Sequence, residues 1–529
     1  MEHAAGHRAP QGIGSEEPAV TAKLIRELGA GAGVTLPEVR VIGEDPVLPS
    51  VFPLGTMAAA SAGALTAAVA AYAARAGECG EEGAGGRRPT RGELGDPDVT
   101  IDVRHAAVAF QSERHFRADG KAMDVWAALS GDYRTSDGWI RLHCNFDHHR
   151  DAAVRALGLS PGSGKEDAAR ACAGRTAMEI EEAVIREGGC AAAMRSRAEW
   201  LAHPQARALA GLPLVGVSRL TGGDGQTSET GRRGTSRSGA GSGGTDSGGA
   251  VGGAGRARAG HMHGGPGNGL PAGTARPLGG VRVLDLTRVI AGPVAARALA
   301  AYGADVLRVG AAHLPEVPGL VVETAFGKRS CHIDLRFEAD KLREMVRQAD
   351  VVIQAYRPGA LRARGFGPDG LAALRPGIVC VDISAYGARG PWASRRGFDS
   401  LVQMACGIAH ENGDGLRPSP LPAQALDHGT GYLAAFGAVA ALLRRAAEGG
   451  SWHVDVSLAR TAAWLDDLGR IDGAGVRQPR VEDLLATMDS SFGTLTYVTP
   501  PGAVDGMRPH WTSPPPRQGE HPAAWAPSP

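Results

Sequence analysis

The second half of the chain alternates short β-branched apolar runs with longer segments whose apolar residues have helical spacing. Five runs predict strands: VRVLDL (281–286), ADVLRV (304–309), CHIDL (331–335), DVVIQAY (350–356) and IVCVDISAYG (378–387). Helical patterns lie between them at 293–303, 338–348 and 359–374. This alternation predicts an α/β fold, a Rossmann-like parallel sheet with helices on both faces. Ligands of such sheets bind beyond the carboxyl ends of the strands.

Two Ala-rich helical segments, 51–75 and 421–445, are similar to each other. When Val439 is aligned with Val69, Met57 lies opposite Asp427. Beyond them, VTIDVRHA (99–106) resembles WHVDVSLA (452–459). Such similarity predicts an internal duplication in which only the later copy carries a carboxylate at this position.

The composition predicts five regions. Residues 1–20 are expected to be disordered, and 21–218 to hold a degenerate copy together with a smaller α+β domain. Residues 219–276 are rich in Gly and Ser, have few large apolar side chains, and are expected to form a flexible linker. Residues 277–470 form the large domain, and 471–529 a return segment with a Pro-rich tail.

Charge and cysteine content narrow the possible partners and compartments. Lys plus Arg equals Asp plus Glu at 56 each, which argues against nucleic acid or a membrane surface as partner. The seven cysteines are scattered without a CxxC pair, as in a reducing compartment. No secretory signal is visible, and the Ala-rich run 57–74 fits a packed helix better than a membrane span. We therefore expect a cytoplasmic protein.

Several segments, in order, are similar to the family III CoA-transferases. This group includes formyl-CoA and carnitine CoA-transferases and 2-methylacyl-CoA racemases. The segments are PLGGVRVLDLTRVIAGPVAARALAAYGADVLRV (277–309), GKRSCHIDL (327–335), ADVVIQAYRPGALRARGFG (349–367) and ISAYGARGPWASRRGFD (383–399). The segment from 137 to 158 resembles the family's small domain, and 490–511 resembles its return segment. The order of the domains along this chain differs from that of the family. We therefore expect a rearranged chain in which the N-terminal and C-terminal halves complete one another across the Gly/Ser-rich linker. The resemblance implies a homodimer or an intramolecular pseudo-dimer.

Matching residue by residue places the family's nucleophilic aspartate at Asp427. A carboxylate can form an anhydride with an acyl group and then hold CoA as a thioester. From the segment alone, Asp427 also fits a helix N-cap, and a helix start favours its ionised form. Gly429 and Gly431 would let backbone amides approach a developing oxyanion. The resemblance implies a coenzyme A thioester as substrate, with no tightly bound cofactor and no metal.

The remaining candidate residues concern coenzyme A. Guanidinium groups suit its phosphates, and the candidates are Arg357, Arg362 and Arg364, with solvated helix positions as the alternative. The TRVIAGP turn brings Val289, Ile290 and Ala291 toward the pantetheine arm or thioester, and Tyr386 lies at a strand end. Where relatives have a glutamate and a Gly/Asp-rich loop, this chain has GAAHLPEVPGL (310–320). The histidines of LHCNFDHHRD (His143, His148, His149) fit structural roles better than a metal site.

Transfer of CoA from an acyl-CoA donor to a carboxylic acid is the function the resemblance favours. The racemases need two acid/base groups and carry a histidine where this chain has Phe398. His428, next to Asp427, is not expected to replace it, because neighbouring side chains at a helix start point in different directions. A CoA-thioester-binding protein without turnover is the third alternative.

Overall fold

The computed structural model describes residues 17–79, 96–123, 127–220 and 276–527. Most of the predicted linker, 221–275, lies outside the described residues. The segment predicted to be disordered, residues 1–20, extends too far, because helix α1 (Glu17–Gly31) begins within it. Residues 1–16 lie outside the described part.

A seven-stranded sheet forms the centre of the molecule, with the strand order β10-β9-β8-β11-β12-β13-β7. Its strands are β8 (Arg282–Leu286), β9 (Asp305–Gly310), β10 (Lys328–His332), β11 (Val351–Gln354), β12 (Val379–Ser384), β13 (Ser451–Ser457) and β7 (Gly216–Leu220). All neighbouring pairs are parallel except β7 on β13. The predicted α/β fold is confirmed. The edge strand β7, which comes from the N-terminal part, was not predicted.

Alternate strand residues enter two cores, one on each sheet face. Val283 and Val351 belong to one core, whereas their neighbours Leu284 and Val352 belong to the other. Strands buried on both faces read as continuous apolar runs, as these do. Helices α11 (Ala291–Ala301) and α17 (Ala425–Glu448) cover the first face, and α13 (Ala339–Arg347) and α14 (Pro368–Leu374) cover the second. The short helix α12 (Pro318–Thr324) follows β9.

The Ala-rich helix α2 (Leu54–Cys79) packs along α17 and joins the first core. Its segment Leu54–Ala76 is long and apolar enough to cross a membrane, but it is almost wholly buried inside the protein. The prediction of a packed helix is confirmed. Strands β1 (Val39–Ile42), β2 (Val99–Asp102) and β16 (Ala503–Val504) form a small sheet near α2.

Both long helices begin against an aspartate from an earlier segment. Asp45 accepts the amides of Gly55 and Thr56, at 3.0 and 2.6 Å. In the same way, Asp399 accepts the amides of the second and third residues of α17, and the third is Asp427. By this geometry Thr56, and not Met57, occupies the position in α2 that Asp427 occupies in α17. The earlier helix still has no carboxylate there.

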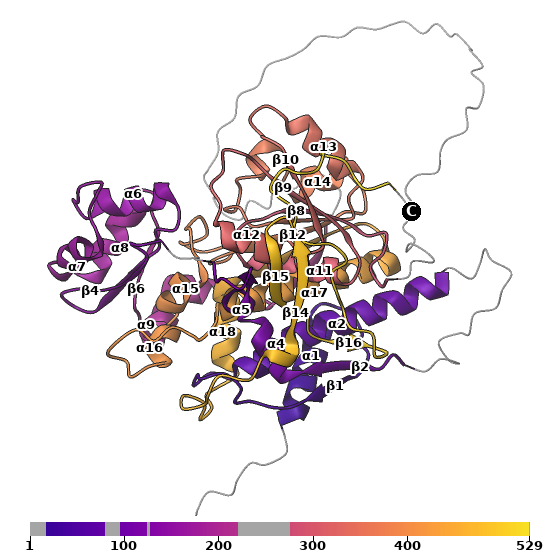
Figure 1. Cartoon of the computed structure of the whole chain (residues 1–529), viewed down its shortest axis with the longest axis horizontal. Coiled ribbons are helices and arrows are strands. Elements are labelled where there is room, and N and C mark those ends of the chain that lie inside the picture. Colours follow the sequence, from indigo (N-terminus) through magenta and orange to yellow (C-terminus); the bar gives the residue numbers. More distant parts are fainter. Residues whose placement is uncertain (1–16, 80–95, 124–126, 221–275, 528–529) are drawn as a thin grey trace, which may run out of the picture.

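A smaller α+β unit lies at one end of the molecule, to the left in Figure 1. It contains the sheet β4-β5-β6 (Gly131–Arg134, Trp139–Leu142, Ala191–Ala193) and helices α6 (Asp147–Ala156), α7 (Lys165–Ala173) and α8 (Ala177–Arg186). These elements share their own apolar core. The helices α4 (Val103–Ala109), α5 (Ser112–His115), α9 (Arg197–Ala202) and α10 (Pro204–Leu209) complete the N-terminal part.

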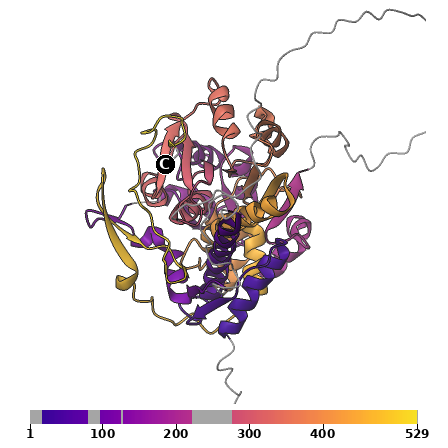
Figure 2. The ribbon, with the colours of Figure 1, turned by 90° about the vertical axis from the view of Figure 1, so that its right-hand side faces the viewer.

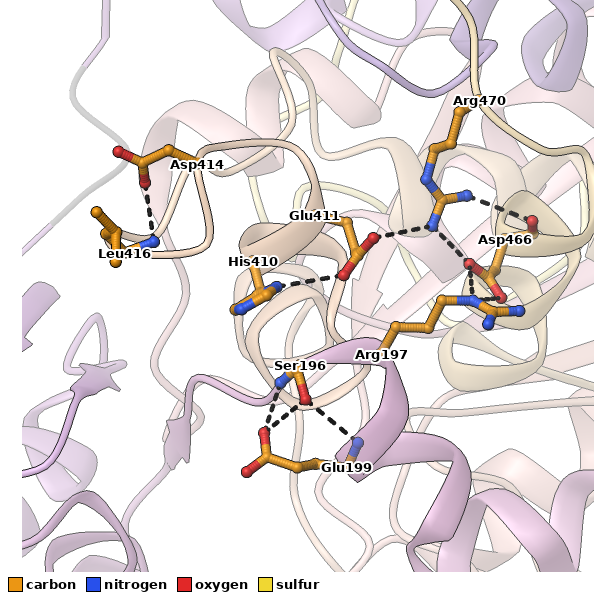
Figure 3. A network of polar contacts seen from close by, with 9 residues as sticks. All are labelled: Ser196, Arg197, Glu199, His410, Glu411, Asp414, Leu416, Asp466 and Arg470. Atoms are coloured by element: carbon orange, nitrogen blue, oxygen red, sulfur yellow. Dashed lines mark hydrogen bonds and ion pairs between the residues drawn. The ribbon is translucent and has the colours of Figure 1, made fainter.

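A polar network that includes one contact between the N-terminal and C-terminal parts is shown in Figure 3. Arg197, on α9, donates to Asp466 on α18 (Leu458–Asp467) at 2.7 Å. Arg470 pairs with the same carboxylate at 2.7 Å and lies 3.9 Å from Glu411, on α16 (Ile408–Glu411). Exposed ion pairs of this kind contribute only about 0–1 kcal/mol each, so the shared apolar core is the main attachment.

The return segment runs back over both parts. Its hairpin β14 (Leu485–Ser490) and β15 (Gly493–Val498), at one side of the molecule in Figure 2, pairs with β3 (Arg117–Ala118). Further along, the indole N–H of Trp511 donates to the carbonyl of Arg297 at 3.0 Å. That of Trp525 donates to the carbonyl of Met345 at 3.1 Å. The tail is therefore anchored to helices of the large domain.

Candidate active site

Asp427 is the third residue of α17, and 7% of its surface is exposed. Two glycines allow neighbouring helices to approach this end of α17. A Cβ atom on Gly431 would lie 2.6 Å from the carbonyl oxygen of Ala291, so α11 and α17 cross at this point. A Cβ on Gly429 would collide with the end of Met57, where α2 crosses. The start of α17 is thus enclosed between two helices.

The capping role belongs to Asp399, which is the first residue of α15 (Asp399–Ala405) and directly follows Phe398. Its Oδ2 accepts the amides of Leu426 and Asp427 at 2.8 and 2.9 Å, and its Oδ1 accepts from Gln403. The N-cap interpretation of Asp427 is therefore wrong. Because the amides of this turn are satisfied by Asp399, the Asp427 side chain is not needed for capping.

The surroundings of Asp427 oppose the ionised form that a helix start favours. Burial raises the pKa of Asp427 well above its usual range, and the nearby carboxyl groups of Asp399 and Glu113 raise it further. Burial likewise raises the pKa of Asp399 to about 6, although its hydrogen bonds oppose the shift. A helix start favours an anion, but here desolvation and like charges outweigh that effect. The surroundings of Asp427 therefore favour its protonated form more than water would.

Glu113, from α5 of the N-terminal part, completes the surroundings of Asp427. Its Oε2 lies 3.0 Å from Nε2 of His428, and both side chains are buried. The imidazole ring of His428 also stacks on Phe110, with ring centroids 5.7 Å apart. His428 therefore turns toward the N-terminal part, in agreement with the prediction that it does not act beside Asp427.

Two cavities meet at Asp427. The first has a volume of about 340 Å³ and lies beyond the carboxyl ends of β8, β11 and β12, where the fold predicts a ligand site. The second has a volume of about 370 Å³ and is bounded partly by α5, β5 and the start of α15. Four residues border both cavities: Val289, Ile290, Phe398 and Asp427.

The first cavity gathers most of the residues that the sequence suggested for coenzyme A. They are Val289, Ile290, Ala291 and Arg357, together with Asp427. Val289 has φ of 75°, a left-handed conformation that is strained for a β-branched side chain. It lies just before α11, whose first amides have no acceptor within the helix. Backbone donors of α11 thus lie at the Asp427 end of the cavity.

The other predicted contacts lie elsewhere. Arg362 pairs with Asp369 at 3.0 Å, and Arg364 donates to the carbonyl of Leu335 at 3.2 Å. Neither lines the two cavities, and both are exposed. Tyr386 is buried and lines neither cavity, with its ring 5.0 Å from that of Trp392.

Gly429 and Gly431 are also placed differently from the predicted oxyanion role. Both lie beyond the first turn of α17, where amides bond within the helix. Their close contacts with Met57 and Ala291 account for the absence of side chains at both positions.

Three further arginines line the first cavity and were not selected from the sequence: Arg288, Arg395 and Arg396. Arg395 pairs with Glu181 at 2.9 Å, and Arg396 donates to the carbonyl of Gly188 at 2.9 Å. The signal was present, since two consecutive arginines stand directly before the GFD motif. Glu113 and Asp399 gave no such signal, because their roles depend on contacts made after folding.

The three histidines of the small unit lie close to this site. His148 and His149 border the first cavity, and His143 borders the second. The His143 ring stacks on Phe398 with centroids 3.7 Å apart, and Nε2 of His149 lies 3.6 Å from the sulfur of Cys190. Among the residues that the structure describes, no group of three or more His, Cys, Asp or Glu side chains is arranged to hold a metal ion.

The fold and site define an α/β protein with a buried carboxyl between two cavities. Residues 278–473 match the family described as CoA-transferase family III, the family that the sequence motifs of this region resemble. An acetyl-coenzyme A transferase of Hypoxylon pulicicidum is 38% identical over 37% of this chain and 34% of its own length. A probable fatty acyl-CoA transferase of Mycobacterium tuberculosis is 34% identical over 39% of this chain and 58% of its own. The human succinyl-CoA:glutarate CoA-transferase is 32% identical over 35% of this chain and 45% of its own length.

A crystal structure of the mycobacterial protein aligns with 32% identity over 36% of this chain and 58% of that chain, at a TM-score of 0.34. The chain spans between about a third and three-fifths of the length of these curated relatives.

Proposed function

We propose that the protein transfers coenzyme A from an acyl-CoA donor to a carboxylic acid acceptor, with Asp427 as the nucleophile. The observation that carries the proposal is the position of Asp427 on the wall of both cavities, beside Arg357 and the TRVIAGP turn. A protein that only binds thioesters would not need a buried carboxyl at the junction. The match of residues 278–473 to the CoA-transferase family supports the same reaction class.

The reaction proceeds through covalent steps on Asp427. The Asp427 carboxylate attacks the thioester carbonyl, and the CoA thiolate leaves, which gives an aspartyl–acyl anhydride. The thiolate then attacks the aspartyl carbonyl of this anhydride and releases the donor acid, which leaves an aspartyl-CoA thioester. The acceptor carboxylate displaces the thiolate to form a second anhydride. Attack of the thiolate on the acceptor's carbonyl releases the new acyl-CoA and regenerates Asp427.

The first cavity is the proposed coenzyme A site. Arg288, Arg357, Arg395 and Arg396 on its wall suit the phosphate groups of the nucleotide, because guanidinium groups bind phosphate oxygens in pairs. The start of α11 adds backbone donors and the positive end of its dipole near the thioester. Oxyanion stabilisation is therefore assigned to this helix start.

Intact-protein mass spectrometry tests the proposal. The full chain is incubated with succinyl-, acetyl-, propionyl- and oxalyl-CoA, treated with hydroxylamine, and digested for peptide mapping. A hydroxamate on Asp427, absent in Asp427→Asn, is expected with a competent donor. If thioesters bind, as measured by calorimetry, but no adduct forms with any donor, the transfer proposal fails and a binding function without turnover is favoured.

One contact bears on the racemase alternative. His143 stacks on Phe398 and lines the second cavity with Asp427, so the protein does place an imidazole near the residue that replaces the racemase histidine. Burial, however, lowers the pKa of His143 to about 3, which makes it a weak base at neutral pH. Transfer remains the better proposal. Loss of α-deuterium from a 2-methylacyl-CoA in solvent water would favour racemisation.

We further propose that each chain has one active site and that α2 derives from a degenerate copy. The shared order of strand, capping aspartate, long helix, strand and short helix in 39–109 and 379–467 supports this origin. The earlier copy has Thr56 at the position of Asp427 and cannot form the anhydride. A hydroxamate on Asp427 alone is the expected result of the same peptide map.

A further inference from the structure

The second cavity differs from the first in its charge pattern. Its wall carries Glu113, Asp399 and Asp427, and also three arginines, Arg114, Arg117 and Arg141. A volume of about 370 Å³ lies within the range of roughly 300–1,000 Å³ that small-molecule sites occupy. The question is which of these charges are already neutralised within the protein.

Two of the three arginines have a carboxylate partner within the protein. Arg141 forms an ion pair with Asp132 at 2.6 Å, and both side chains are largely buried. Arg114 is half-exposed and lies 4.0 Å from Glu113, whose other oxygen is 3.0 Å from His428.

Arg117 is different, because no carboxylate among the described residues pairs with it. Its Nη1 donates hydrogen bonds to the carbonyls of Arg114 and Phe116, at 2.6 and 2.8 Å. These bonds fix the guanidinium group and use only one of its three nitrogens, which leaves Nε and Nη2 for an acid. Arg117 also lies on strand β3, paired with Thr496 of β15, so its backbone is held by the return segment. A cation that is held in place and has no carboxylate partner among the described residues is typical of an anion-recognition residue.

From this we infer that the second cavity receives the carboxylic acid acceptor, and that Arg117 selects acids carrying a second carboxylate. The inference rests on the proposed function, in which the reacting carboxylate of the acceptor contacts Asp427. The second carboxylate would bind the free edge of the Arg117 guanidinium. Arg117 is thus a specificity-determining residue contributed by the N-terminal part, whereas the nucleophile comes from the C-terminal part.

The test compares dicarboxylic acids with monocarboxylic acids of equal chain length. Succinate, glutarate and adipate are compared with butyrate, pentanoate and hexanoate as acceptors for the full chain, with the donor identified by the adduct experiment. The dicarboxylates are expected to have a kcat/KM at least about tenfold higher, as a charge-assisted hydrogen bond implies. Arg117→Gln should bring the ratio close to one while the monocarboxylate rates persist, and Arg117→Lys should restore part of the preference.

Arg155→Gln is the matched control, because this exposed arginine pairs with Glu187 and lines neither cavity. It should leave the acceptor ratio unchanged. Thermal unfolding of each variant separates loss of recognition from loss of folding.

A second measurement does not depend on turnover. Saturation-transfer NMR of glutarate with Asp427→Asn should show binding that Arg117→Gln removes from the same background. If Asp427 forms adducts but the acceptor ratio is insensitive to Arg117, the inference is overturned and the proposed function stands. If no adduct forms but glutarate binding requires Arg117, the acid site stands and the transfer proposal fails.

Discussion

Nε2 of His428 lies 3.0 Å from Oε2 of Glu113, although 315 residues separate them in the chain. This contact fastens the residue next to the proposed nucleophile to a helix of the N-terminal part. It also brings a carboxyl group close enough to Asp427 to raise the pKa of Asp427. The N-terminal part therefore influences the ionisation of the proposed active site.

Replacing Glu113 with Gln is expected to shift the pH profile of adduct formation toward lower pH. Loss of the Glu113 charge removes one of the causes that raise the pKa of Asp427, so the reactive carboxylate forms at a lower pH. The rate of adduct formation from pH 5 to 9 measures the shift. Glu344→Gln, on the exposed surface of α13, should leave the midpoint unchanged. An unaltered midpoint in Glu113→Gln would leave Glu113 with a structural role only.

Asp427→Asn should abolish adduct formation and yet stabilise the protein at neutral pH. The folded-state pKa of Asp427 is raised, so the folded protein binds this proton more tightly than the unfolded chain. Stability therefore falls as the pH rises from the unfolded pKa, about 4, through the folded value. Asn cannot ionise, so it removes this pH-dependent penalty. Urea unfolding at pH 4 and pH 8 should show a larger gain at pH 8, and a gain at pH 4 alone would contradict the assignment.

Gly431→Ala is expected to impair the site by separating α11 from α17. The added methyl group would lie 2.6 Å from the carbonyl oxygen of Ala291 and 3.0 Å from Val294, neither of which is the end of a flexible side chain. Overpacking of this kind costs about 1–3 kcal/mol, and the shift would move the TRVIAGP turn away from Asp427. Thermal unfolding and adduct rates measure both effects. Gly475→Ala, where the added methyl meets no atom within 4 Å, is the control.

Arg357→Gln should weaken acyl-CoA binding, whereas Arg362→Gln should not. Arg357 lines the first cavity, whereas Arg362 lines neither cavity and pairs with Asp369. Loss of one guanidinium–phosphate contact is expected to raise the Kd for acyl-CoA by roughly 10–100-fold. Isothermal calorimetry with a non-transferable thioether analogue gives this value directly. Equal effects of the two substitutions would place the phosphates outside the first cavity.

The order of strands and helices in the large domain could be predicted because its sequence pattern is local. Runs such as VRVLDL have few alternatives to a buried strand, and the predicted limits differ from the observed ones by a few residues. The strand β7 could not be predicted in the same way, since its partner lies more than two hundred residues along the chain. Pairing over such a separation leaves no periodic signal in either segment.

The site likewise combines residues with a local sequence signal and residues without one. Contiguous motifs made three features recognisable, namely Asp427, Arg357 and the TRVIAGP turn, and the structure brings them together at one cavity. Asp399 and Glu113 act on Asp427 through a hydrogen bond and a charge, across 28 and more than 300 residues. The sequence did not reveal the upward shift in the pKa of Asp427, because a helix start was visible in it but the surrounding carboxyls were not.

The pairing of β7 with β13 makes the C-terminal part depend on a strand from the N-terminal part. Because β7 covers the outer edge of the central sheet, a truncated product that begins after residue 220 would expose the unpaired backbone of β13. Exposed strand edges invite self-association. Expression of the family region by itself is therefore expected to yield aggregates, whereas co-expression of the two segments as separate polypeptides should recover a soluble complex.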